Sequence, residues 1–186
     1  MTDSFDMTSL QYRREEIRQE ADSFRQTHWP DDIIPVDIEL IVEQMGLDLE
    51  PIAGIKKDSG ITASLCPDLK TICIDLETML DPRQAVYLRF SLAHEIGHWV
   101  LHRQFFEWQK RQGLSTVRDW IAFVRQCSGH VFAHRFEQDA NEFAGRLLVP
   151  VVQLRRALDE VLTPEVHKEI SGYPGEVVRD FLAGPI

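Results

Sequence analysis

The stretch FSLAHEIGHWVLH, residues 90–102, carries three histidines and one glutamate in an otherwise mainly apolar segment. His94 and His98 are four residues apart, so in a helix both imidazoles lie on one face, with Glu95 one step further round. The apolar residues follow a helical repeat and predict a buried helix: Phe90, Leu92, Ala93, Ile96, Trp99, Val100 and Leu101. The stretch therefore predicts a helix that directs two metal-binding side chains to one point.

Histidine pairs with this spacing bind zinc, which accepts imidazole nitrogens and leaves a position open for water in catalytic sites. A divalent metal lowers the pKa of the water that it binds, so hydroxide becomes available near neutral pH. Glu95 is offset from the expected metal position and is placed to accept a proton rather than to bind the ion. The alternative is an exposed helix with scattered histidines, but a buried His or Glu needs a partner. Gly97, in mid-helix, permits another backbone or a ligand to come close.

A catalytic zinc ion usually has three protein ligands, so a third is required. His102 follows His98 by four residues, but it lies about 80° around the helix from His94 and about two turns along it. One straight helix does not bring all three rings to one ion. We therefore expect His102 to line the site or to contact a ligand rather than to bind the metal.

The better source of a third ligand is HRFEQDANEFAGRLLVP, residues 134–150. Glu137 lies on the flank of its apolar stripe and is the acid expected to face the core. Asp139 and Glu142 fall on the opposite side, where solvated carboxylates are expected. His134 shares the face of Glu137 approximately and is the rival ligand.

Asn141 lies one helical turn after Glu137, where it is placed to hold a ligating histidine by its other ring nitrogen. The small residues Ala140 and Ala144 favour close packing of this helix on the helix that carries HEIGH. Three further histidines are expected at the surface: His28, His130 and His167.

The remaining sequence predicts an α+β fold with a small sheet or hairpin before the HEIGH helix. The expected elements are helices over 9–26 and 36–46, a strand over 47–52, a hairpin over 60–77 around a Pro-Asp turn, a helix over about 82–103 begun by Asp81 and Pro82, a loop over 104–114, helices over 115–127 and 134–149, and three short helices within 151–186. The chain contains no linker long enough to divide it, so a single domain over 1–186 with a short helical tail over 151–186 is expected.

Net charge, cysteine spacing and the lack of long apolar runs argue against several classes of protein. The 186 residues carry a formal net charge of -10, which argues against direct binding of nucleic acid, because phosphate recognition requires a basic face. The three cysteines follow no CxxC spacing, which favours free thiols in a reducing compartment. No apolar run suggests a signal peptide or a membrane span. We therefore expect a soluble cytoplasmic protein with no membrane partner.

RFSLAHEIGHWVLH, followed by EQDANEFAGRLLVP, resembles the ImmA/IrrE family of metallopeptidases. That family has an HExxH helix and a later helix of the form E-x-x-A-N-x-F-A-x-x-L-L-x-P. The resemblance covers roughly residues 10–155. It implies a zincin-like peptidase core, with zinc bound by His94, His98 and Glu137 and with Glu95 as the general base. Mn²⁺ or Fe²⁺ would also suit a His₂Glu site.

Members of this family resemble one another in cleaving DNA-binding regulators, often helix-turn-helix repressors of mobile elements or stress genes. Other members belong to toxin–antitoxin pairs. The resemblance therefore implies a zinc endopeptidase that cuts a helix-turn-helix repressor or antitoxin, and the acidic chain suits a basic partner. The alternatives are a protein that only binds such a partner and a metal hydrolase of a small amide or nucleotide. A regulatory domain after the core is expected to be absent or replaced by the short tail.

Two features near the predicted site remain open in the sequence. The hairpin over 60–77 either offers an edge strand to an extended substrate peptide or simply closes the core. Tyr87 precedes His94 by seven residues and shares its helix face, and we expect it to pack in the core.

Overall fold

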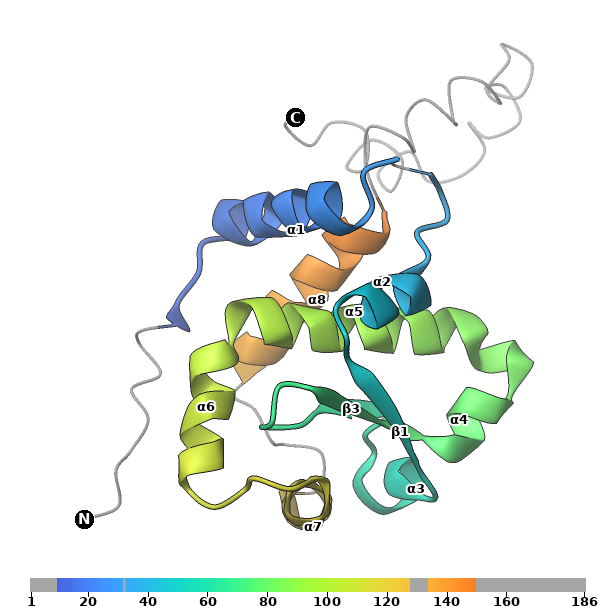
Figure 1. The fold of residues 1–186 in the computed structure, drawn as a ribbon, viewed down its shortest axis with the longest axis vertical. Coiled ribbons are helices and arrows are strands. Elements are labelled where there is room, and N and C mark those ends of the chain that lie inside the picture. The colour runs from blue at the N-terminus through green and yellow to red at the C-terminus, as the bar shows by residue number, and fades with distance from the viewer. Residues whose placement is uncertain (1–9, 32, 128–133, 150–186) are drawn as a thin grey trace, which may run out of the picture. The chain divides into compact units, whose positions relative to one another are not determined.

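The computed structural model describes residues 10–31, 33–127 and 134–149 (Figure 1). The chain divides into two compact units, residues 1–148 and residues 149–186. All the elements described below belong to the first unit. The helices expected within 151–186 lie outside the described residues.

The first unit is mostly helical and contains one small sheet, so the expected α+β class is confirmed. Its elements are α1 (Arg14–His28), α2 (Ile38–Gln44), β1 (Asp48–Ile52), α3 (Ile55–Ser59), β2 (Ala63–Leu65), β3 (Thr71–Asp75), α4 (Leu76–Leu80), the 3₁₀ turn η2 (Pro82–Gln84), α5 (Ala85–Leu101), α6 (Arg103–Arg111), α7 (Val117–Cys127) and α8 (His134–Leu148).

The sheet has the strand order β1-β3-β2. β2 and β3 are antiparallel, with Ala63 opposite Ile74, which confirms the predicted hairpin. β1 pairs with β3 in parallel, with Leu49 opposite Ile72. This parallel pairing was not predicted, because local alternation identifies a strand but not its neighbour. β2 is therefore an edge strand of the sheet.

Helices cover both faces of this sheet, with α5 on one side and α3 and α7 on the other (Figure 1). The buried side chains of Leu92 and Ile96 lie on α5, and Leu65 and Ile72 of the sheet belong to the same core cluster. On the other face, the Trp120 indole Nε1–H of α7 donates to Ser64 Oγ over 2.9 Å. The sheet is thus held between two layers of helix.

The predicted start of the HEIGH helix is confirmed. Asp81 accepts a hydrogen bond from the backbone N–H of Arg83, Pro82 begins a 3₁₀ turn, and α5 follows directly. Thr116 caps the start of α7, because the Asp119 N–H donates to Thr116 Oγ1.

The loop expected over 104–114 was wrong, because most of that segment forms α6. Phe105, Phe106 and Gln109 are buried on one side of α6, and polar residues occupy the other side. The many charged and amide side chains suggested a loop, but their spacing is that of an amphipathic helix. Gly113, at a φ of 96°, follows the end of this helix.

The expectation that Asp139 is solvated was also wrong, since Asp139 is buried. Helix α1 packs against α8, which the sequence of α8 alone does not reveal (Figure 1). Glu142 is half-buried in the same interface, where it pairs with Arg14 and Arg18 of α1 at 2.9 and 2.7 Å. The side of α8 expected to face water is therefore an interhelical contact.

Cys66 and Cys73 are buried free thiols, with their sulfur atoms 3.0 Å apart in the hairpin. Burial and the neighbouring Cys73 thiol raise the pKa of the Cys66 thiol, so it stays protonated. None of the described helices is both long and apolar enough to cross a bilayer.

Candidate metal centre

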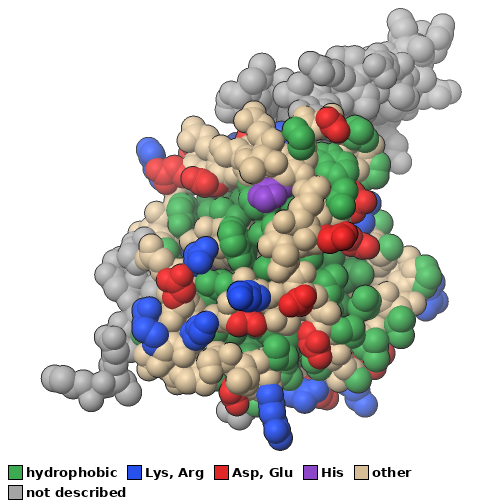
Figure 2. All heavy atoms as spheres, viewed as in Figure 1, with side chains coloured by type: hydrophobic (Ala, Val, Ile, Leu, Met, Phe, Trp, Pro, Cys, Tyr) green, Lys and Arg blue, Asp and Glu red, His purple; other side chains and the backbone are tan. Residues whose placement is uncertain are grey.

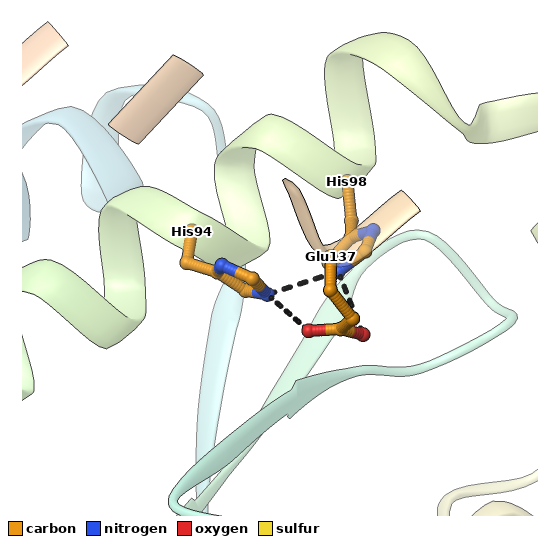
Figure 3. A group of neighbouring side chains, drawn as sticks. All are labelled: His94, His98 and Glu137. Atoms are coloured by element: carbon orange, nitrogen blue, oxygen red, sulfur yellow. Dashed lines mark hydrogen bonds and ion pairs between the residues drawn. The ribbon is translucent and has the colours of Figure 1, made fainter. Parts of the chain in front are cut away.

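Two helices bring three metal-binding side chains together (Figure 3). His94 and His98 extend from α5, and Glu137 reaches them from the first turn of α8. His94 Nε2 lies 3.0 Å from His98 Nε2 and 3.2 Å from Glu137 Oε2, while His98 Nε2 lies 3.7 Å from Glu137 Oε1. The three residues selected from the sequence therefore form one cluster.

The cluster fits a divalent cation. Zinc holds imidazole nitrogen and carboxylate oxygen at about 2.0–2.2 Å in a tetrahedral arrangement, so its ligand atoms lie roughly 3.3 Å from one another. The three separations between ligand atoms, 3.0, 3.2 and 3.7 Å, lie close to that value. Two imidazoles and one carboxylate also leave a fourth position free for water or substrate.

A second contact orients the ring of His94. Its Nδ1 lies 2.9 Å from Asn141 Oδ1, one turn after Glu137 on α8. When Nε2 of His94 binds a cation, the ring proton lies on Nδ1 and donates to this amide oxygen. The expectation that Asn141 holds a ligating histidine matches this geometry.

The ring of His98 is oriented by another histidine. Nδ1 of His98 lies 2.9 Å from Nδ1 of His102, and both rings are buried. With Nε2 of His98 directed to the cation, His98 Nδ1–H donates and His102 Nδ1 accepts. His102 stacks on Phe136 of α8, with ring centroids 4.2 Å apart. His102 is thus outside the metal cluster and contacts one of its members, in the position expected for it.

Burial determines the protonation of these two rings. Burial lowers the pKa of His98 well below its usual value, and the charges of His94 and His102 lower it further. Burial likewise lowers the pKa of His102 to about 3. Both rings are therefore neutral near pH 7, which a metal ligand and a hydrogen-bond acceptor require.

His94 behaves differently because it faces two carboxylates. Burial lowers the pKa of His94, but the hydrogen bond to Glu137 and the charge of Glu95 outweigh this effect and raise it above the usual value. A positive charge is therefore favoured at this position. This is the electrostatic environment that suits a bound cation.

Glu95 is 5% exposed and points towards the edge strand. Its Oε2 accepts a hydrogen bond of 2.7 Å from the backbone N–H of Leu65 in β2. Burial raises the pKa of Glu95 to about 7, against the lowering effects of His94 and the Leu65 N–H. A carboxyl group with this pKa takes up or releases a proton near neutrality, as a general acid or base requires.

These groups line a cavity of about 260 Å³ between α5, the start of α8 and the edge strand. Tyr87 and Phe90 of α5 and residues 60–64 also line the cavity. The expectation that Tyr87 and Phe90 pack in the core was wrong, since they are 49% and 36% exposed. Their spacing of seven and four residues before His94 placed them on its face, but only the fold shows that this face is open there.

Among the described residues, the remaining histidines are not in the cluster. The rival ligand His134 is exposed at the first residue of α8. His28 was expected at the surface but is half-buried against Phe24, and burial lowers its pKa. His130 and His167 lie outside the described residues. Leu65 was not selected from the sequence, because its role depends on a backbone N–H that carries no sequence signal.

Comparison of the chain with protein-family models, with curated proteins and with solved structures gave no match.

Proposed function

We propose that this chain is a metal-dependent endopeptidase with a zincin-like core, in which His94, His98 and Glu137 hold zinc. The convergence of two imidazoles and one carboxylate beside the buried Glu95 carries the proposal. The resemblance of the HEIGH and EQDANEFAGRLLVP segments to the ImmA/IrrE metallopeptidases supports the same class of reaction. Mn²⁺ and Fe²⁺ are the other ions that suit these ligands.

The bound metal would lower the pKa of water and polarise the scissile carbonyl. Glu95 accepts a proton from the water molecule as the water oxygen attacks the carbonyl carbon of the peptide. The protonated Glu95 then donates that proton to the leaving amine. One carboxyl group serves both steps because its pKa is raised to about 7. The Leu65 N–H holds the carboxylate of Glu95 in one orientation.

The edge strand β2 is the candidate binding surface for the peptide. Thr62 O accepts from the Asp75 N–H and the Cys66 N–H donates to Thr71 O, so both residues turn their main-chain groups towards β3. In an antiparallel ladder the main-chain N–H and C=O groups of Ala63 and Leu65 point the other way, towards the edge of the sheet and away from β3. The Leu65 N–H already donates to Glu95 on that side. An extended substrate segment would pair with the remaining groups by β-addition.

The proposed substrate is a DNA-binding regulator of the helix-turn-helix class, either a repressor or an antitoxin. The net charge of -10 favours encounter with a basic protein. On the face drawn in Figure 2, acidic and basic side chains are interspersed and no continuous basic area is present. Such a face favours a protein partner over nucleic acid.

Metal analysis and cleavage assays on four proteins test the proposal. Wild type should contain one equivalent of metal and cut a basic regulator at one site, with discrete fragments by mass spectrometry. Glu95→Gln should keep the metal and lose cleavage, and Glu137→Ala should lose the metal. Glu39→Gln, at an exposed position of α2, is the matched control and should behave like wild type.

Two outcomes of this assay would support other functions. If Glu95→Gln retained the biological effect on the regulator, the chain would act by binding its partner without proteolysis. If wild type bound metal stoichiometrically but hydrolysed small amides or nucleotides and no protein, it would be a metal hydrolase of another class.

A further inference from the structure

Phe90 is an apolar side chain of α5 close to His94 of the metal cluster. It precedes His94 by one helical turn, and the two ring centroids are 6.5 Å apart, with 39° between the ring planes. Its side chain lines the same cavity as His94 and Glu95 and remains 36% exposed. An exposed aromatic ring beside a reaction centre is a contact surface that the fold itself does not fill.

The charges around the cavity are few. Among the described residues that line it, the acidic and basic side chains, apart from the two histidines, are Glu95 and Glu137. The ammonium of Lys56 lies over the ring of Tyr87, 4.8 Å from its centroid. That ammonium already donates to Thr78 Oγ1 and Gln84 Oε1. An acidic substrate side chain would therefore lose water at Phe90 without gaining a lysine or arginine of the cavity wall as a partner.

A hydrogen bond joins two of the residues that line the cavity together with Phe90. The Thr62 hydroxyl donates to the Tyr87 hydroxyl over 3.2 Å, which joins the start of the edge strand to α5. Ile61, half-buried, also lines this part of the cavity. A side chain that enters here meets two aromatic rings and one aliphatic side chain.

We propose that Phe90 determines substrate specificity by packing against an apolar side chain next to the scissile bond. This inference rests on the proposed endopeptidase function and specifies its substrate class: an extended segment with an aliphatic or aromatic residue at one of the two positions that flank the cut. Burial of such a side chain against Phe90 favours it over an acidic residue by about 10- to 100-fold in kcat/KM.

A peptide mixture with randomised central positions tests this specificity with the zinc-loaded full chain. Wild type should enrich apolar residues at one flanking position. Phe90→Ala should lower kcat/KM for the best apolar peptide at least about tenfold, with metal content and thermal unfolding unchanged. Phe90→Lys should shift the preference towards acidic residues. Val86→Ala, on the same helix, 79% exposed and outside the cavity lining, is the control and should keep the wild-type preference.

Cleavage without preference at either flanking position, or an unchanged apolar preference in Phe90→Ala, would overturn the assignment. Binding answers the same question without turnover, using a peptide hydroxamate with a leucine side chain and its aspartate counterpart. Calorimetry should show wild type binding the leucine compound about tenfold more tightly, and Phe90→Ala should remove most of that difference. Equal affinity of wild type for both compounds would also overturn it. If no peptide were cut while the hydroxamate preference persisted, the endopeptidase proposal would fail, and Phe90 would be shown to select apolar ligands without determining a cleavage site.

Discussion

Gly97 of α5 packs directly against the backbone of Ala140 in α8. A Cβ atom at Gly97 would lie 3.1 Å from both Cα and O of Ala140 and 3.3 Å from Cβ of Phe143. Such contacts are closer than side chains normally tolerate, and backbone atoms cannot turn away as a flexible side chain does. The absence of a side chain at Gly97 therefore sets the distance between the helix that carries His94 and His98 and the helix that carries Glu137.

Gly97→Ala should consequently damage both stability and metal binding. Overpacking costs about 1–3 kcal/mol, and the better helix propensity of alanine recovers only about 1 kcal/mol of this. Because the helices must move apart, metal affinity should fall at least about tenfold. Gly145→Ala in α8 is the matched control, since its Cβ would meet nothing within 4 Å. Denaturant unfolding and metal titration would contradict this account if the two variants behaved alike.

Asn141→Leu should weaken metal binding without abolishing it. The substitution removes the acceptor 2.9 Å from His94 Nδ1, so the ring is no longer held with Nε2 towards the cluster. Loss of such an orienting contact typically lowers metal affinity about 10- to 100-fold. Competition titration with a chelator measures the change. Asn141→Asp, which keeps an acceptor, should bind metal more tightly than Asn141→Leu, and Gln138→Ala, exposed on the same helix, should match wild type.

The contact between His98 and His102 is tested by comparing two substitutions. His102→Leu fills much of the space but leaves the buried Nδ1–H of His98 without its acceptor, at a cost of about 1–3 kcal/mol. His102→Asn keeps an acceptor near the position of Nδ1 and should retain more metal affinity, although leucine packs better against Phe136. If the two variants bound metal equally, the hydrogen bond would contribute nothing to the orientation of His98.

The hydrogen bonds to the Asp75 carboxylate, at the end of β3, should make the stability of the fold depend on pH. Its carboxylate is buried and accepts hydrogen bonds from the Lys56 N–H, the Thr78 N–H and the Thr78 hydroxyl. Burial raises the pKa of Asp75, but these hydrogen bonds outweigh that effect and lower it below the usual value. The folded pKa is thus below the unfolded value of about 3.9. The stabilisation is fully present above the unfolded pKa and is lost as the pH falls through the folded pKa.

Asp75→Asn should accordingly cost about 1–3 kcal/mol in the free energy of unfolding at pH 7. The difference from wild type should shrink as the pH is lowered below about 4, because Asp75 of the unfolded chain then binds a proton that the folded chain binds only at lower pH. Urea unfolding at several pH values measures both quantities. Asp48→Asn, at an exposed position of β1, should change stability little at any pH. A difference that stayed constant from pH 7 to pH 3 would contradict the assignment.

The sequence by itself predicted most of the local elements and the members of the metal cluster. Helical spacing placed His94 and His98 on one face of α5 and Glu137 beside the apolar stripe of α8, and strand alternation located the hairpin. These predictions succeeded because 3.6-residue and 2-residue periodicities are properties of short segments. Such signals are present whether or not the neighbouring elements are known.

Only the tertiary structure decided which faces stay open and which are covered. The sequence predicts that Phe90 and Tyr87 are core residues, but they line a cavity. It predicts that Asp139 is solvated, but Asp139 is buried. The parallel pairing of β1 with β3 and the role of the Leu65 N–H likewise have no local signal. The physical reason is that burial requires two surfaces in contact. A helix face is buried only when another element packs on it, and that element comes from elsewhere in the chain.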